Sequence, residues 1–226
     1  MNISDRLTRV AKMVEKCGTV ADIGCDHGYV TIYLLKNGIA ERAVSADVNK
    51  GPLEACEKNL RLEHVSDKAK VLLSDGFKSF DDTEKIETAV IAGMGGRLMK
   101  RILTEGEKHV KNMSQLVLQP QSEIFLIREW VRENNFHIER EEILKEDGKY
   151  YFILDVRRGK REEEFREVYD SFSKYLIEKK DPLLIEYLRR GLNNNLKYLQ
   201  GIEESRQGRL LHENALIEEA LSQMES

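Results

Sequence analysis

Short apolar runs alternate with amphipathic stretches from the N-terminus to about residue 158. The runs are rich in Val, Ile, Leu and Ala, which is typical of strands buried on both faces of a parallel sheet. Between them, apolar residues recur every three or four positions, as in helices that cover such a sheet. The predicted strands begin at Thr19 and then cover residues 43–47, 70–76, 86–92, 115–119, 136–144 and 150–156.

The last two predicted strands flank Glu146-Asp147-Gly148-Lys149, which has the composition of a hairpin turn. The chain order is therefore a series of strand–helix units followed by an antiparallel hairpin. We expect an α/β fold with a Rossmann-like, seven-stranded doubly wound sheet in which the last strand is antiparallel.

The pattern changes after Arg157-Arg158-Gly159-Lys160, where long amphipathic stretches replace the alternation. They predict a C-terminal helical hairpin packed as an antiparallel coiled coil. We therefore expect a sheet domain at residues 1–158 and a coiled-coil domain at residues 159–226. The apolar positions of the hairpin are Leu183, Leu184, Tyr187, Leu188, Leu192, Leu196, Leu199 and Ile202, then Leu210, Leu211, Ala215, Ile217 and Leu221.

Composition and charge argue against a membrane, secreted or metal-binding protein. The chain lacks the run of roughly 20 apolar residues that a membrane span needs, and its first residues lack a signal-peptide core, so we expect a cytoplasmic protein without a membrane partner. Cys17, Cys25 and Cys56 have neither disulfide nor zinc spacing, and the five histidines are scattered, so no metal is expected. The net charge of −4 leaves room for a local basic patch but argues against nonspecific coating of nucleic acid.

The first strand ends in Asp22-Ile23-Gly24-Cys25-Asp26-His27-Gly28. Gly24 and Gly28 allow the backbone to approach a ligand closely. The spacing differs from the Gly-x-Gly-x-x-Gly turn that binds a dinucleotide, and Asp26 would repel a diphosphate. An acidic turn suits a ligand with a positive centre and a free amino group, such as S-adenosylmethionine (SAM).

Acidic residues also end the second and third strands. Asp47 is placed to bind ribose hydroxyls, with Val48 beside it in the cofactor site; alternatively, Asp47 caps the helix that begins near Gly51. Asp75, followed by Gly76, is placed beside the adenine amine of the cofactor; alternatively, the pair forms a simple turn. Both acids belong to the carboxyl edge of one parallel sheet, where open α/β folds bind ligands.

The fourth strand leads into Gly93-Met94-Gly95-Gly96-Arg97. Closely spaced glycines after a buried strand indicate that something approaches the backbone, and Met94 is placed to support the cofactor or a target base. The fifth strand ends in Gln119-Pro120-Gln121-Ser122, whose amides are placed to bond a base edge or the backbone. Alternatively, Gln121 or Ser122 only caps the next helix.

Two clusters of cations flank this edge. The first predicted helix, capped by Ser4, carries one of them, and the helix after the fourth strand carries the other. Each cluster is a candidate for contacts with phosphate, and the alternative is a solvated helix face. The clusters are Arg6, Arg9 and Lys12, and Arg97, Lys100 and Arg101.

The motifs of the sequence favour methyl transfer over acyl or hydride transfer. No Gly-x-Ser-x-Gly elbow for acyl transfer occurs, and hydride transfer stays open as an alternative that the acidic turn disfavours. Methyl transfer from a sulfonium needs mainly an acceptor lone pair placed in line with the methyl carbon, at about 3 to 3.5 Å. A site made of backbone and a few acids can supply that placement.

The motifs Asp22 to Gly28, Asp47, Asp75-Gly76 and Ala92-Gly93-Met94-Gly95-Gly96, followed by a helical hairpin, resemble the bacterial TrmK family. The resemblance covers the whole chain. It implies a class I methyltransferase domain at residues 1–158 that uses SAM to methylate N1 of adenine 22 in tRNA. The implied cofactor-binding residues are Asp22, Gly24, Cys25, His27, Gly28, Asp47, Val48, Asp75, Gly76, Gly93 and Met94. The implied tRNA-binding residues are Arg6, Arg9, Lys12, Gly95, Gly96, Arg97, Lys100, Arg101, Gln119 and Gln121.

A mechanism of this kind requires the target base to be flipped or exposed, and methylation gives the ring a positive charge. Asp26 is the candidate carboxylate for stabilising that charge or taking the exocyclic proton, and Tyr29 is the candidate for stacking on the base. Alternatively, Asp26 only bonds the cofactor's amino group or caps the helix. We expect His27 to support the turn and not to act as a base.

Other functions stay open from the sequence. One is a SAM-dependent methyltransferase of another RNA, a protein or a small molecule. Another is a noncatalytic module that senses a nucleotide and recruits a partner through the hairpin. The hairpin either docks tRNA or associates with a second copy, so the oligomeric state, a monomer included, is also open.

Overall fold

The computed structural model describes residues 3–161, 165–201 and 203–225. These residues form two compact units. The first holds the residues up to Arg140 together with Tyr151–Arg161, and the second holds Glu141–Tyr150 together with the described residues beyond 164. Each unit is described by itself.

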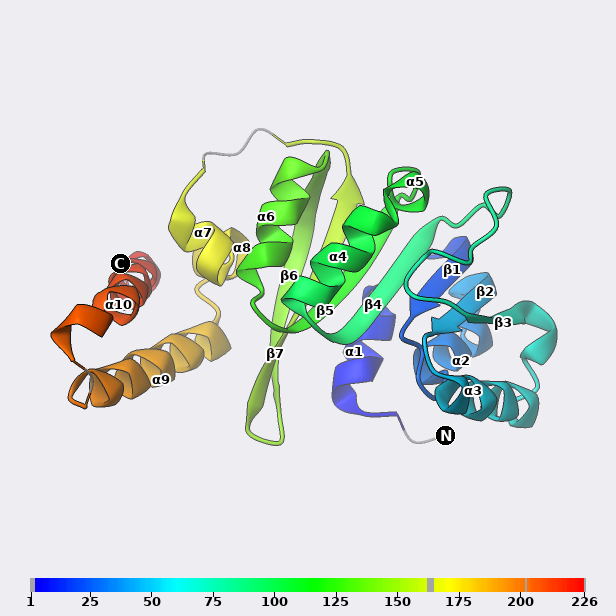
Figure 1. The fold of residues 1–226 in the computed structure, drawn as a ribbon, viewed down its shortest axis with the longest axis horizontal. Helices are drawn as coiled ribbons and strands as arrows, with labels where there is room; N and C mark the ends of the chain where they lie inside the picture. The colour runs from blue at the N-terminus through cyan, green and yellow to red at the C-terminus, as the bar shows by residue number, and fades with distance from the viewer. Residues whose placement is uncertain (1–2, 162–164, 202, 226) are drawn as a thin grey trace. The chain divides into compact units, whose positions relative to one another are not determined.

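The described strands form one seven-stranded sheet with the order β3-β2-β1-β4-β5-β7-β6 (Figure 1). Strands β1 to β5 pair in parallel, whereas β5 pairs with β7 in antiparallel orientation. This arrangement confirms the predicted sheet with a reversed last strand. The strands are β1 (Cys17–Ile23), β2 (Ala40–Asp47), β3 (Ala69–Leu73), β4 (Thr88–Gly95), β5 (Gln115–Ser122), β6 (Phe136–Glu146) and β7 (Lys149–Arg158).

Helices connect the parallel strands. Ser4 caps the first helix, as predicted, because its Oγ accepts a hydrogen bond from Leu7 N at 3.2 Å. The apolar faces of the helices pack on strands whose side chains are largely buried, which gives a core between the helical layers and the sheet. The helices are α1 (Asp5–Met13), α2 (Tyr29–Lys36), α3 (Lys50–Leu62), the 3₁₀ helix η1 (Ser66–Lys68), α4 (Gly96–Glu105), α5 (Glu107–Val110) and α6 (Phe125–Glu133).

The strand order reverses between β1 and β4. From β1 the chain moves outward through β2 to β3, and from β4 it moves in the opposite direction to β5. Because crossovers between parallel strands are right-handed, α2 and α3 cover one face, and α4 and α6, which lie side by side in Figure 1, cover the other. The reversal creates a switch point at the carboxyl ends of β1 and β4, which is where ligands bind in open α/β sheets.

Strand β4 extends further than the apolar run predicts. It continues to Gly95, and its pairing with β5 shifts register between Ala92 and Met94 and again before Gly95. The glycine-rich segment is therefore an irregular end of a strand that still follows β5, with Gly93 left out of the ladder.

In the second unit, two long helices form the predicted hairpin. Asp181 caps α9, and Pro182 occupies its first turn. Arg189 bonds Glu225, and the buried Asn195 bonds the buried Asn214 at 3.0 Å, so the helices run in opposite directions. The helices of this unit are α7 (Glu167–Phe172), α8 (Lys174–Glu178), α9 (Pro182–Leu199), the 3₁₀ helix η2 (Glu204–Arg206) and α10 (Gly208–Glu225).

Candidate active site

The turn after β1 is fixed by its own backbone and by β2. Gly24 N and Cys25 N both donate to the carbonyl oxygen of Ala46, at 2.8 and 3.1 Å, and Gly28 N donates to Cys25 O at 2.7 Å. Gly24 and Gly28 both have φ of 73°, a conformation that glycine adopts without a steric cost. The turn is therefore held before any ligand arrives.

Asp22 lies beneath the turn, buried, and stabilises the start of α2. Its Oδ2 accepts hydrogen bonds from Thr31 Oγ1 at 2.7 Å and from Thr31 N at 3.3 Å, and Thr31 Oγ1 also lies 2.7 Å from Ser45 Oγ. Burial raises the pKa of Asp22 to about 6, although the Thr31 hydrogen bonds lower it. One oxygen of Asp22 is thus used within the protein, and it links β1, α2 and β2.

Helix α3 supports the other end of the turn. Cys56 packs so closely on Gly28 that a Cβ there would lie 2.6 Å from its sulfur, and Asn59 Nδ2 donates to His27 O at 2.9 Å. The Cys56 thiol lies beside Cys25, and this contact together with burial raises the pKa of Cys25. Sequence reasoning missed Cys56 and Asn59 in this role, although their spacing of three residues places them on one helix face.

The tip of the turn brings Asp26, His27 and Tyr29 together. Asp26 has φ of 48°, and its side chain is 68% exposed. His27 Nε2 lies 3.6 Å from Asp26 Oδ1, and the His27 ring stacks on Tyr29 with a centroid distance of 5.5 Å. A carboxylate and an aromatic ring therefore stand at the switch point on a rigid base.

At the end of β2, Asp47 is half-buried and folds back on the chain. Its Oδ1 accepts from Asn49 N at 2.9 Å, whereas the residue at the N-cap of α3 is Asn49, so Asp47 is not the helix cap. Val48 is 56% exposed. An exposed apolar side chain beside a carboxylate can contact both the base and the ribose of a nucleoside.

At the end of β3, Asp75 is bound by cations. Arg101 donates to both of its oxygens, at 2.8 and 2.9 Å, and Lys78 donates at 2.6 Å. These bonds, first that from Arg101 and then that from Lys78, hold the pKa of Asp75 below its ordinary value. Gly76, with φ of 62°, packs against Ile102 of α4. Asp75 therefore links the end of β3 to α4. This ion pair goes beyond the local turn that the sequence offered as the alternative role of Asp75 and Gly76.

The segment from Gly93 to Gly96 contacts protein on several sides. Gly93 N donates to Gln119 Oε1 at 3.1 Å, and Met94 Cε sits where a Cβ on Gly24 would be. A Cβ on Gly95 would lie 3.2 Å from Ser122 Oγ, and one on Gly96 would collide with Glu123 O. The places of a Cβ on the last two glycines are therefore taken by the β5–α6 connection.

Gln119 and Gln121 differ in environment, since Gln119 is fully buried and Gln121 is exposed. Helix α6 has Ile124 at its N-cap without a side-chain cap, so the alternative in which Gln121 or Ser122 caps that helix is wrong. A Cβ on Gly93 would lie 3.8 Å from Gln121 Nε2, which places this amide beside the same segment.

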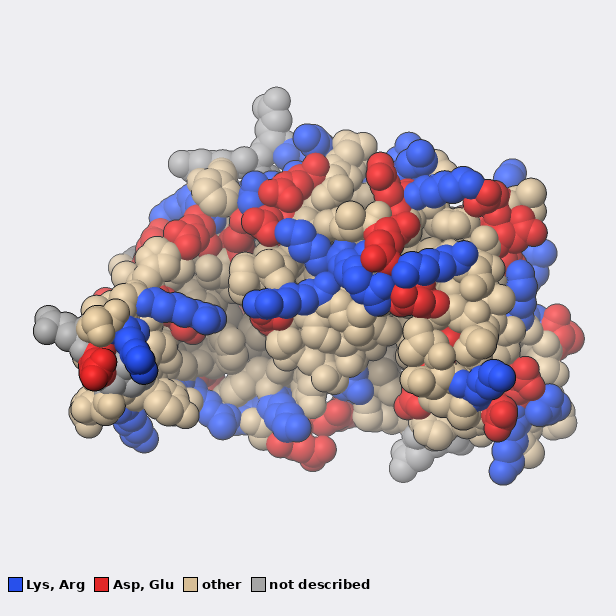
Figure 2. All heavy atoms as spheres, viewed as in Figure 1, with Lys and Arg blue, Asp and Glu red and all other residues tan. Residues whose placement is uncertain are grey.

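The two cation clusters are bonded differently. On α4, Arg97 bonds Glu123 at 2.7 Å, Lys100 bonds Glu129 at 2.6 Å, and Arg101 bonds Asp75. Figure 2 shows the result, with Lys and Arg side chains interleaved with Asp and Glu over the face that carries α4. Each predicted phosphate contact on this helix therefore has a competing carboxylate.

On α1, Arg6 is half-buried and bonds Gln119 Oε1 at 2.6 Å, whereas Arg9 and Lys12 are exposed. Lys12 has no ion-pair partner among the described residues. An exposed cation without a competing carboxylate is the better phosphate ligand, because it gives up no ion pair on binding.

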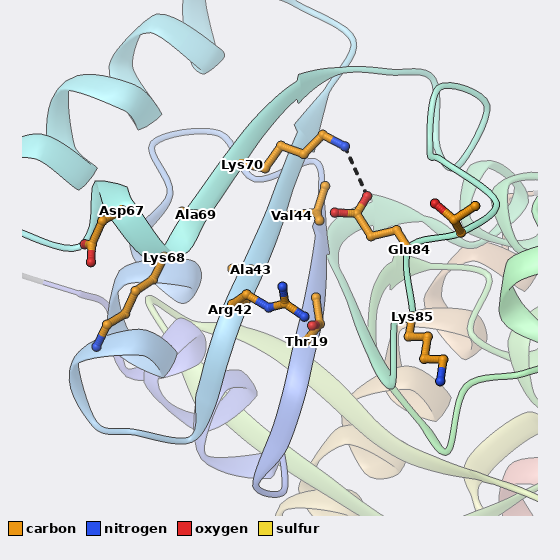
Figure 3. A pocket seen from close by; sticks show the side chains of 11 residues that line it. Thr19, Arg42, Ala43, Val44, Asp67, Lys68, Ala69, Lys70, Glu84 and Lys85 are labelled. Atoms are coloured by element: carbon orange, nitrogen blue, oxygen red, sulfur yellow. Dashed lines mark hydrogen bonds and ion pairs between the residues drawn. The ribbon is translucent and has the colours of Figure 1, made fainter.

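A cavity of about 490 Å³ lies elsewhere in the first unit. Figure 3 shows it at the amino halves of the strands, where Arg42 of β2 points toward Thr19 of β1 and Lys70 bonds Glu84 at 3.1 Å. The predicted site residues all lie away from it, at the carboxyl edge or on α1 and α4. This cavity is therefore separate from the candidate active site.

Neither a metal site nor a membrane span is found in the described part of the chain. Groups of three or more His, Cys, Asp or Glu that could hold a metal are absent from the described residues. No described helix is long and apolar enough to cross a membrane.

Comparison with known proteins addresses the whole chain. The sequence model of the TrmK family, described as tRNA (adenine(22)-N(1))-methyltransferase, matches residues 20–226. The chain belongs to this family. The chain is 32% identical to the tRNA (adenine(22)-N(1))-methyltransferase of Bacillus subtilis over 162 residues, which is 72% of the chain and 68% of that protein.

Two solved structures are similar over nearly their full length. A candidate tRNA (m1A22) methyltransferase of Streptococcus pneumoniae, in complex with S-adenosyl-L-methionine, is 31% identical with a TM-score of 0.89, covering 97% of this chain and 100% of the other. The TrmK of M. capricolum, in complex with S-adenosyl-homocysteine, is 26% identical with a TM-score of 0.90, covering 98% and 99%. TrmK enzymes transfer a methyl group from SAM to N1 of adenine 22 in tRNA, which confirms the predicted activity and cofactor.

Proposed function

We propose that the carboxyl ends of β1, β2 and β4 hold SAM and that Asp26 and Tyr29 act on adenine 22 of tRNA. The observation that supports this assignment is the exposed Asp26 beside the half-buried Tyr29, on a turn that the protein holds through Asp22, Thr31 and Asn59. Rigid support is what precise placement of reacting groups requires.

The residues present fit the cofactor. Gly24 and Gly28 give the turn its positive φ and hold it in place before a ligand arrives, and Asp47 offers a half-buried carboxylate to ribose hydroxyls. Val48 offers an exposed apolar surface to adenine. When bound, SAM supplies a methyl group on a positively charged sulfur.

The chain's own groups then serve the transfer. Adenine N1 has an in-plane lone pair, so it forms the new bond to the methyl carbon while the sulfur keeps the electrons of the broken bond. The ring becomes cationic, and the Asp26 carboxylate stabilises this charge. Tyr29 offers a ring on which the flipped base stacks, and the stacked His27 restricts the orientation of Tyr29.

The remaining assignments are parts of the same proposal. Residues 1–158 form the methyltransferase domain, and residues 159–226 form the coiled-coil domain. The protein acts in the cytoplasm on tRNA, and one copy suffices because a single chain contains all the proposed site residues. On α1, Arg9 and Lys12 contact phosphates. Lys12 contributes more than the α4 cations, because carboxylates already bind Arg97, Lys100 and Arg101.

The test uses an unmodified tRNA transcript incubated with the protein and SAM, followed by mass spectrometry of the nucleosides. We expect 1-methyladenosine from the transcript and none from a matched transcript in which adenine 22 is replaced by guanine. Equal methylation of both transcripts would show that the target is a different nucleotide.

A further inference from the structure

The backbone N–H of Gly93 is bonded by a side chain instead of a strand. The register shift between β4 and β5 leaves Gly93 outside the ladder, with φ of 80°. Its N–H donates to Gln119 Oε1 at 3.1 Å. This hydrogen bond substitutes for the missing ladder bond and helps to fix the path of the chain into Met94.

The orientation of the Gln119 amide is determined by its partners. Gln119 is fully buried, and its Nε2 donates to Pro120 O at 3.1 Å. Its Oε1 accepts from both Gly93 N and Arg6 Nη1. Reversing the amide would turn an NH₂ group toward two donors, which costs two hydrogen bonds in a buried place.

Arg6 is the charged partner in this network. Its Nη1 donates to Gln119 Oε1 at 2.6 Å, and its guanidinium lies 5.3 Å from the centroid of the Tyr151 ring. The half-buried side chain thus connects α1 with β5 and β7. A charge-assisted hydrogen bond is stronger than a neutral one, so Arg6 contributes strongly to the orientation of Gln119.

The network continues to the cofactor turn. Gly93 precedes Met94, and the Met94 side chain packs directly on Gly24, where a Cβ would collide with it. Arg6 therefore acts on the turn after β1 through Gln119, Gly93 and Met94 in sequence.

We propose that Arg6 is a positioning residue for methyl transfer, which orients Gln119 and through it fixes the Gly93–Met94 segment against Gly24. This inference rests on the proposed function, because it assigns the β1 turn and the β4 segment to one site. It replaces the phosphate contact that the sequence predicts for Arg6.

The decisive experiment is a double-mutant cycle with Arg6→Met and Gln119→Met, measured as kcat and as KM for tRNA. We expect Arg6→Met to lower kcat about tenfold, because a displaced segment misplaces the reacting groups, with KM for tRNA changed by less than about twofold. In the Gln119→Met background, Arg6→Met should have no further effect on kcat, since the two residues act as one unit.

If Arg6 instead contacts a phosphate of the tRNA, the substitution should change KM and not kcat. Arg6→Met would then raise KM for tRNA in both backgrounds, and it would reduce the slope of log affinity against log salt by about 0.9. Either result overturns the proposal. Arg42→Met is the matched control, because Arg42 is an exposed arginine at the other end of the sheet; its kcat and KM should equal those of the wild type.

One measurement remains informative if a variant is poorly folded. Hydrogen exchange at the Gly93 amide should be slow in the wild type and faster in Arg6→Met, and unchanged exchange also overturns the proposal.

The same experiments separate this inference from the proposed function. If the wild type methylates the transcript and Arg6→Met does so at an unchanged rate, the positioning role fails and the function stands. If the wild type binds SAM without methylating tRNA, the proposed function fails, and the exchange rate at Gly93 still decides the role of Arg6.

Discussion

The turn after β1 and the irregular end of β4 both contain closely spaced glycines, and they use them for different purposes. In the first, Gly24 and Gly28 have positive φ and present the exposed residue Asp26 and the neighbouring ring of Tyr29. In the second, Gly95 and Gly96 make room for Ser122 and the backbone of Glu123.

Packed atoms fill the place of a Cβ at all four glycines, so the difference lies in the backbone: Gly24 and Gly28 have positive φ, whereas Gly95 and Gly96 do not. The β1 turn is held from below and leaves its tip open to a ligand. The β4 segment is held by side chains from other elements, and of its glycines only Gly93 has no atom closer than 3.8 Å to the place that a Cβ would take. Substitution of the exposed Asp26 in the first should therefore affect chemistry, and substitution of Gly96 in the second should affect stability.

The largest expected effect is that of Asp26→Ala on turnover. Removing the carboxylate that stabilises the cationic ring should lower the single-turnover rate about a hundredfold, while SAM binding measured by calorimetry changes little. Asp26→Asn is the control for side-chain size and should lose nearly as much. Full turnover of both variants would assign Asp26 only to the structure of the turn.

Gly96→Ala tests the second segment. The new Cβ would collide with Glu123 O, and the α6 connection would have to move, so we expect a loss of about 2 kcal/mol in the free energy of unfolding. Denaturant unfolding measures it. Gly38→Ala is a control for adding a methyl group, since nothing lies near its Cβ, although its φ of 63° carries backbone strain of about 1 kcal/mol. An equal loss in both variants would contradict the packing argument.

The free energy of unfolding should depend on pH through Asp22, which lies beneath the β1 turn. Burial raises its pKa in the folded state from 3.8 to about 6, so the folded protein binds the proton more tightly than the unfolded chain. The stabilisation is complete below the unfolded pKa and is lost as pH rises through the folded pKa. Relative to Asp22→Asn, the wild type should lose about 2 kcal/mol of unfolding free energy between about pH 4 and 6.

The pH dependence of Asp22 can be checked by unfolding both proteins in urea across this range. A difference between wild type and Asp22→Asn that is constant with pH would show that Asp22 is not the titrating group.

The smallest expected effect concerns the cations beside the two segments. Lys12→Ala should weaken tRNA binding about threefold and reduce the salt slope by about 0.9, which corresponds to one lost phosphate contact. Arg97→Ala should change affinity less, because Arg97 already bonds Glu123. Binding titrations at several salt concentrations measure both, and a larger loss for Arg97→Ala would reverse the assignment.

The fold was predictable because each strand is a compact apolar run and each helix has a local signal. Ser4 caps α1 as predicted, and the hairpin turn at Asp147-Gly148 joins β6 and β7. The nearness of Asp26, His27 and Tyr29 also follows from sequence, since they share one turn. These features depend on residues that are close along the chain.

The rest depended on long-range packing. Arg6 and Gln119 are 113 residues apart, and their bond depends on a register shift that no local pattern indicates. Likewise, carboxylates from other elements bind the α4 cations: Asp75 follows β3, Glu123 precedes α6 and Glu129 lies within α6. The sequence shows the cations without showing that they are paired. The expected roles of these residues were therefore the hardest to predict.

The amide pair between Asn195 and Asn214 has a consequence for the hairpin. If α10 slid along α9 by one helical turn, about 5.4 Å, two buried amides would face apolar side chains without partners. The pair therefore favours a single register between the two helices. When the hairpin binds tRNA or a partner, α9 and α10 should keep this register and not slide along each other.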